Sequence, residues 1–115
     1  MLFNMKITEL YQKVVGVVIM VTGINENDIL HSNREECADA RYLLVRVLSD
    51  KLSDKETGLL IGRTRQGVSF IRSNDTKMRK WSVMSAWREI DDHIKKDFFL
   101  IKLLCVSQKC YIFAV

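Results

Sequence analysis

The sequence contains no proline, and this absence favours a mostly helical chain, because proline interrupts helix interiors. It has three cysteines, an odd set without zinc-ligand spacing, and two isolated histidines, His31 and His93. We therefore expect no metal site, and reduced thiols in a cytosolic protein. No acid pair, Ser-His-Asp set or Cys-His pair has a recognisable catalytic context. The sequence predicts a protein that is not an enzyme and that needs no cofactor or small-molecule substrate.

Long apolar runs are also scarce. The most apolar stretch, residues 14–21, is too short to span a bilayer, so we expect no membrane partner. No small-x-small cleavage site follows it, and we interpret it as a buried helix rather than a secretion signal. With 115 residues, of which 48% are hydrophobic and 28% charged, the chain is expected to form a single domain over residues 1–115 with its own core.

Capping residues and glycines mark the ends of the first predicted helices. A helix is expected over about residues 8–22, where Gly23 ends it, and a short one over 26–30, capped by Asn25. Ser32 and Glu35 form a capping-box pattern, which predicts a third helix to about residue 50. Its inner stripe would consist of Ala38, Tyr42, Val45, Leu48 and Leu52.

The second half of the chain is also helical in pattern. After the turn-like residues 73–75, apolar periodicity predicts helix over about 76–106, with a break near 91–92 or 96–97. The last residues, 110–115, have strand-like composition but no partner strand, and the sequence leaves the role of the tail over 107–115 open. Taken together, these patterns predict an all-α fold, with C-terminal helices and tail over 76–115.

The most informative stretch is residues 52–72. Ser53 followed by Glu56 is a capping box, so a helix should begin there, with residues 59–61 as its buried side chains. Gly62 should end this helix, because glycine adopts the left-handed cap conformation without steric cost. The stretch thus predicts a first helix of a helix-turn-helix that covers about residues 53–73.

A second helix is expected to follow the glycine. Thr64 can serve as its N-cap, and Val68 and Ile71, three residues apart, should face inward. A helix held in this way after a tight turn has the geometry that enters a DNA major groove, where Arg and Gln make bidentate contacts to guanine and adenine. The side chains that fall on its outer side are Arg65, Gln66, Ser69 and Arg72.

Charge is distributed unevenly along the chain, although the net charge is only +4. Acidic residues outnumber basic ones over residues 26–56. The order reverses over residues 58–80, where Asp75 is the only acid. Positive charge gathered on the second helix and the segment after it is typical of nucleic-acid binding, while the alternative is a solvated basic face. The basic residues concerned are Arg63, Arg65, Arg72, Lys77, Arg79 and Lys80.

Several short motifs occur in a characteristic order between about Ile7 and Leu104. Their order resembles that of the C-terminal DNA-binding domain of the bacterial chromosomal replication initiator, DnaA, a member of the Trp-repressor-like helical class. The motifs are Glu26-x-Asp-Ile-Leu30, Asp39-Ala-Arg-Tyr-Leu-Leu44, Leu52-Ser-x-x-Glu-x-Gly58, Gly62-Arg63 and His93-Ile-Lys-Lys-Asp-Phe98.

The resemblance implies sequence-specific binding to double-stranded DNA in the regulation of replication or transcription. It implies that Arg41 reaches into the minor groove; the alternative is an exposed arginine paired with Glu36 or Asp39. Arg63, at the start of the second helix, is expected to bind a phosphate. The residues predicted to contact DNA are Arg41, Arg63, Thr64, Arg65, Gln66, Ser69, Arg72 and Lys77.

The sequence departs from the family at the positions that read bases. After Gly-Arg the family usually has Asp-His-Ser/Thr-Thr-Val, whereas residues 64–68 here are Thr-Arg-Gln-Gly-Val, and only Val68 matches. The DNA sequence recognised should therefore differ from the initiator's. The loop over 32–36 has lost much of the family's positive charge. No Gly-x-x-x-x-Gly-Lys-Ser/Thr loop occurs in these 115 residues, so we expect no counterpart of the initiator's ATPase portion in them.

The altered base-reading residues leave a second functional hypothesis open. This is a protein-interaction module that kept the fold without DNA binding, with the C-terminal helices as a possible contact with another protein. A third, weaker hypothesis is an antitoxin-like or phage regulator that dimerises through the last helix. For the leading hypothesis, we expect a cytoplasmic protein associated with the nucleoid.

Overall fold

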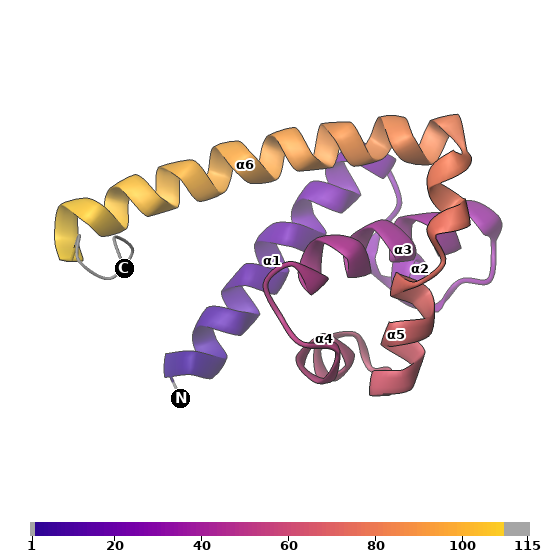
Figure 1. Cartoon of the computed structure of the whole chain (residues 1–115), viewed down its shortest axis with the longest axis horizontal. Helices are drawn as coiled ribbons and strands as arrows, with labels where there is room; N and C mark the ends of the chain where they lie inside the picture. The colour runs from indigo at the N-terminus through magenta and orange to yellow at the C-terminus, as the bar shows by residue number, and fades with distance from the viewer. Residues whose placement is uncertain (1, 110–115) are drawn as a thin grey trace.

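The computed structural model describes the backbone of residues 2–109 and the side chains of residues 7–96. Within these residues the regular elements are all helices, without strands, which confirms the predicted all-α class (Figure 1). Residues 110–115, for which strand-like composition was noted, lie outside the described part. The elements are α1 (Leu2–Thr22), α2 (Glu26–His31), α3 (Glu35–Ser49), α4 (Asp54–Ile61), α5 (Arg65–Arg72), the 3-10 helix η1 (Asp75–Arg79) and α6 (Trp81–Lys109).

Helix α3 is the central element of the fold. It contacts α1, α2, α4, α5 and α6 (Figure 1). Because neighbours surround it, buried side chains occur on most of its circumference, and Tyr42, Val45 and Leu48 are buried as the sequence predicts. Ala38 and Leu52 are only partly buried. The buried residues of α3 are Cys37, Ala40, Tyr42, Leu43, Leu44, Val45, Val47 and Leu48.

The apolar stretch of α1 is buried on one side only. Val14 and Val18 belong to the core, where α1 packs on α3 and α6. Gly16 is exposed and Met20 is 58% exposed, so the expectation that all of residues 14–21 are buried is wrong. Positions four apart share a helix face, and Gln12, Gly16 and Met20 form the face of α1 that turns to solvent.

Two of the predicted helix boundaries before α3 are confirmed. Gly23, with a φ of 73°, follows the end of α1, and the Asn25 side chain accepts a hydrogen bond from the Asp28 amide at the start of α2. The predicted capping box at Ser32 is wrong. α2 continues to His31, so Ser32 ends that helix through its amide, and α3 begins after Arg34 without a side-chain cap.

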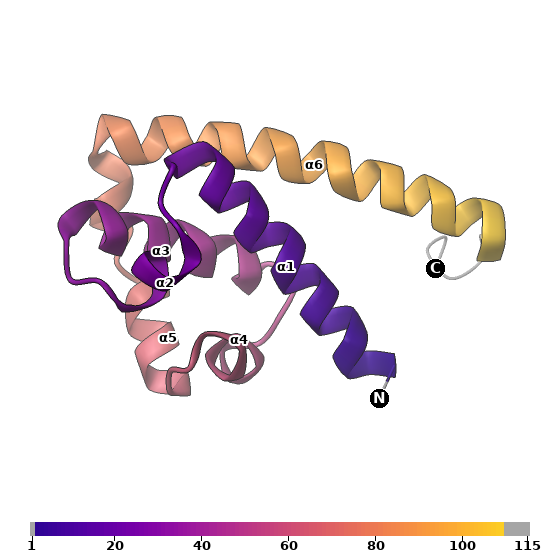
Figure 2. The ribbon, with the colours of Figure 1, turned by 180° about the vertical axis from the view of Figure 1, so that it is seen from behind.

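The C-terminal half departs from the predicted helix over 76–106. Residues 75–79 form η1, Lys80 is extended, and α6 begins at Trp81. Helix α6 then runs without the predicted break, along one edge of the molecule and past the ends of the other helices (Figure 2). Ion pairs from Asp91 to Lys95 and from Asp92 to Lys96, each four residues apart, stabilise the turns where the break was predicted.

Candidate nucleic-acid interface

Helix α4 begins at the predicted capping box. The Ser53 hydroxyl accepts from the Glu56 amide at 3.1 Å, and the Glu56 carboxylate accepts from the Ser53 amide at 3.0 Å. Gly62, with a φ of 74°, ends the helix in the left-handed conformation, as the sequence predicts. Leu59, expected to be buried, is instead 77% exposed. The inner face of α4 consists of Thr57, Gly58 and Ile61, and Leu59 lies outside this face.

The connection between α4 and α5 is short and closely packed. It consists of residues 62–64, and the Arg63 amide donates to the Gly58 carbonyl at 2.9 Å. A Cβ atom on Gly58 would lie 2.4 Å from the Arg63 carbonyl oxygen, a separation that real Cβ atoms do not show. Gly58 therefore permits the turn backbone to lie directly against α4, which sets the angle at which α5 leaves the turn.

Helix α5 is held at both ends. Thr64 accepts a hydrogen bond from the Gly67 amide at 3.0 Å through its hydroxyl oxygen, which confirms it as the N-cap. Val68 is buried and Ile71 is partly buried against the core. At the other end, the Arg72 guanidinium donates two hydrogen bonds to the Asp54 carboxylate, at 3.1 and 2.9 Å.

The first turn of α5 projects outward. Arg65 and Gln66 are exposed, and neither side chain has a hydrogen bond or ion pair with any residue in the described part of the chain. The helix N-terminus adds a partial positive charge at the same place, and the amides of the first turn are hydrogen-bond donors. This turn therefore presents two unengaged polar side chains and a positive potential to solvent. Ser69, one turn further, is half-buried.

Arg41 and Arg63 converge on the C-terminal end of α2. Arg41 donates from Nε to the Ile29 carbonyl at 2.8 Å and from Nη2 to the Ser32 carbonyl at 2.6 Å. Arg63 donates to the Leu30 carbonyl at 2.9 Å. Carbonyls at a helix end lack helical partners, and two cations satisfy them here. Burial and then the neighbouring Arg63 charge lower the pKa of Arg41.

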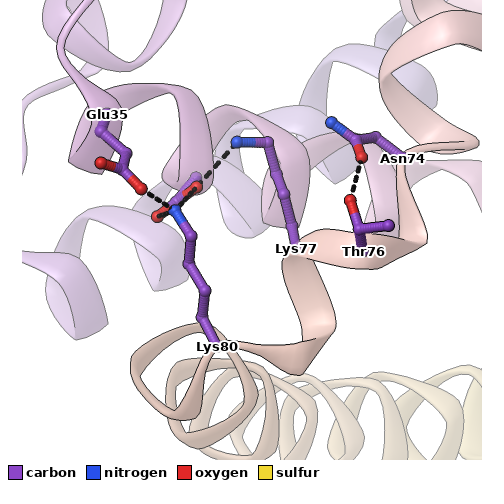
Figure 3. A network of polar contacts seen from close by, with 6 residues as sticks. Glu35, Asn74, Thr76, Lys77 and Lys80 are labelled. Carbon is purple, nitrogen blue, oxygen red and sulfur yellow. Dashed lines mark hydrogen bonds and ion pairs between the residues drawn. The ribbon is translucent and has the colours of Figure 1, made fainter.

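The suggested pairing of Arg41 with Glu36 or Asp39 is wrong, because Arg41 binds backbone carbonyls. Asp39 binds lysines instead. Lys77 Nζ lies 2.8 Å from the Asp39 carboxylate, and Lys80 bridges Asp39 and Glu35 (Figure 3). Hydrogen bonds to Glu35 and Asp39 raise the pKa of Lys80. These contacts anchor η1 and the start of α6 to the first turns of α3.

These ion pairs reduce the positive charge available between residues 63 and 80. Arg72 is paired with Asp54, and Lys77 and Lys80 are paired with acids of α3. Arg63, Arg65 and Arg79 have no acidic partner among the residues that the structure describes. Of the basic residues predicted to contact DNA, Arg65 alone is exposed with no engaged donor, and its neighbour Arg63 uses one donor on Leu30.

The structure thus divides the predicted DNA contacts into separate places. Residues 63–66 lie together at the start of α5, with Arg41 adjoining Arg63 at the end of α2. Arg72 lies at the opposite end of α5 and Lys77 on η1. Sequence reasoning missed Phe70, which is 77% exposed on α5. Its position four residues after Gln66, on the same helix face, was the available signal.

The described residues contain neither a metal-binding cluster nor a membrane-spanning helix. No group of three His, Cys, Asp or Glu side chains there lies close enough to hold a metal ion. No helix among residues 2–109 is both long and apolar enough to cross a membrane.

Comparison with known proteins gives no identification. No protein-family model, no curated protein and no solved structure matches the chain. The resemblance to the replication initiator's DNA-binding domain therefore stays a prediction from the sequence motifs.

Proposed function

We propose that this protein binds double-stranded DNA in a sequence-specific manner, with α4 and α5 acting as a helix-turn-helix and α5 in the major groove. The observation that carries the proposal is the pair Arg65 and Gln66, exposed and unengaged on the first turn of α5. The N-terminal residues of a recognition helix are those that reach base edges. Arg and Gln are the side chains that read guanine and adenine there.

Phosphate contacts in this proposal come first from the residues beside that turn. Arg63 keeps four of its five guanidinium donors free after binding the Leu30 carbonyl. Arg41 is committed to two backbone carbonyls, so its contact with the minor groove requires the end of α2 to lie against the DNA or the side chain to move. Carboxylate partners neutralise the charges of Arg72 and Lys77, so each binds a phosphate at full strength only after release from its partner.

The motif order extends the proposal to the regulation of replication or transcription. A protein with this activity is expected in the cytoplasm, associated with the nucleoid. Because the residues at the base-reading positions differ from those of the initiator family, the proposed target differs from the initiator's recognition sequence.

The test is selection of bound sites from random duplexes with the wild type, Gln66→Ala and Arg63→Ala. The wild type is expected to yield a consensus. Gln66→Ala should change the base preference at one position, with a loss of about 1–3 kcal/mol of discrimination there. Arg63→Ala should weaken binding to all sequences alike. Gln12→Ala, which removes an exposed glutamine of α1, is the matched control and should keep the wild-type consensus. Recovery of no consensus by the folded wild type would overturn the proposal.

A second candidate function, a protein-interaction module, has its own observation. Trp81 is 81% exposed at the start of α6, and with Met84 and Arg88 it lines a shallow groove on that helix. Exposed tryptophan is enriched at protein interfaces. A folded protein that binds no duplex DNA would favour this function, and Trp81→Ala would then weaken the protein contact.

A further inference from the structure

Phe70 is a large apolar side chain held away from the core. It is 77% exposed, although Val68 and Ile71 on either side of it pack into the core. Those two residues fix the rotation of α5, so the outward direction of Phe70 follows from the packing of the helix itself. Exposure of a phenylalanine leaves its apolar surface in water, and this surface is available to a ligand.

Phe70 and Gln66 lie on one face of α5. They are four residues apart, so they are neighbours on the helix surface, separated by about 6 Å along its axis. The outer face of α5 therefore carries an amide at its first turn and an aromatic ring at its second. The unpaired Arg65 and the positive helix N-terminus adjoin the amide, so the face as a whole suits a polyanion with an apolar group at a fixed distance.

The major groove of A·T-containing DNA offers such a surface. Adenine presents the N7 acceptor and the N6 donor that a glutamine side chain binds, and thymine presents a 5-methyl group that phenylalanine contacts. Successive bases on a strand are about 3.4 Å apart, so 6 Å corresponds to roughly two base pairs. We infer that Phe70 contacts a thymine methyl group within about two base pairs of the adenine bound by Gln66. This inference rests on the proposed DNA binding.

Replacement of single thymines by uracil in the selected site tests the inference, because uracil lacks only the 5-methyl group. For the wild type, uracil at one position near the Gln66-dependent base should weaken binding about fourfold, the effect of exposing one methyl-sized group. Phe70→Ala should bind the thymine and uracil duplexes equally. Leu59→Ala is the matched control, since Leu59 is equally exposed but lies on α4, and it should keep the wild-type loss.

The outcomes separate this inference from the proposed function. If the wild type selects a consensus that depends on Gln66, but uracil has no effect at any position, DNA binding stands and the role of Phe70 is wrong. A uracil effect that persists in Phe70→Ala also overturns it. If the wild type selects no sequence, both proposals fail. Phe70→Ala should fold, because the side chain is exposed, and circular dichroism checks this. The uracil series on the wild type tests the inference even without this variant.

Discussion

Arg72, the last residue of α5, binds Asp54, the first residue of α4, through two hydrogen bonds of 3.1 and 2.9 Å. The pair joins the two helices at the ends away from the Gly62 turn, and it occupies a guanidinium that the sequence suggested would bind DNA. The hydrogen bonds and the charge of Asp54 raise the pKa of Arg72. In the proposed complex, a DNA phosphate would compete with Asp54 for the same cation.

Release of Arg72 should strengthen DNA binding. In Asp54→Asn, Arg72 keeps its position but loses its counter-charge, so we expect higher affinity for duplex DNA and a log–log salt slope steeper by about 0.9, the value for one more phosphate. Titrations across a salt series measure both quantities. Asp92→Asn removes an acid of α6 that is paired with Lys96, and should leave the slope unchanged. Equal gains in the two variants would show that only net charge matters.

Replacement of Gly58 and of Gly16 by alanine should change the free energy of unfolding in opposite directions. The Cβ of Gly58→Ala would collide with the Arg63 carbonyl, so the variant should lose about 1–3 kcal/mol of unfolding free energy, the typical cost of overpacking. Gly16→Ala meets no atom within 4 Å, and in the middle of α1 it should gain about 0.5–1 kcal/mol. Denaturant unfolding measures both. A neutral Gly58→Ala would contradict the close approach of the turn to α4.

The free energy of unfolding should fall at alkaline pH, because ionisation of Tyr11 favours the unfolded chain. Burial raises the pKa of Tyr11, and the hydrogen bond to Glu26, 2.6 Å long, and the charge of that carboxylate raise it further. In the unfolded chain tyrosine ionises near pH 10. The contribution of Tyr11 to the free energy of unfolding is therefore complete below about pH 10. Above this pH the unfolded state binds fewer protons than the folded state, so the contribution falls by up to about 1.4 kcal/mol per pH unit.

Comparison with Tyr11→Phe isolates this effect. The variant should be less stable near pH 7 by about 1 kcal/mol, for the lost hydrogen bond, and should show a shallower decline above about pH 10. Some decline should remain, because burial also raises the pKa of Tyr42. Parallel declines of the two proteins in denaturant unfolding at alkaline pH would show that Tyr11 ionises normally in the folded state.

The local features of the fold could be predicted from the sequence. The Ser53 capping box, the Gly62 turn and the Thr64 cap each depend on residues within four positions of one another, so the sequence contains all the information they require. The outward direction of Arg65 and Gln66 follows from the same local pattern. The wrong prediction of a capping box at Ser32 also has a local cause, because α2 continues one residue beyond the predicted end at residue 30.

The partners of the charged residues could not be predicted. Arg72 pairs with a residue 18 positions away, Lys77 with one 38 positions away, and Arg63 with a carbonyl 33 positions away. Such pairings depend on how α5 lies against α4, how η1 lies against α3 and how the α4–α5 turn lies against α2, which no local pattern specifies. The sequence therefore predicted a basic segment, and the structure shows that acids of α3 and α4 partly neutralise it.

The proposed function requires the first turn of α5 to contact DNA. The most direct measurement is the affinity of Arg65→Glu for the selected duplex near physiological salt, compared with Arg88→Glu on α6. Both variants change net charge equally and alter exposed residues. Electrostatic effects at this salt extend only about 8 Å, so only a charge near the DNA should matter strongly. We predict that Arg65→Glu loses about tenfold or more in affinity, for one lost charge-assisted contact of at least 1.4 kcal/mol, while Arg88→Glu stays close to wild type. Equal affinities for the two variants would show that the first turn of α5 does not contact the DNA.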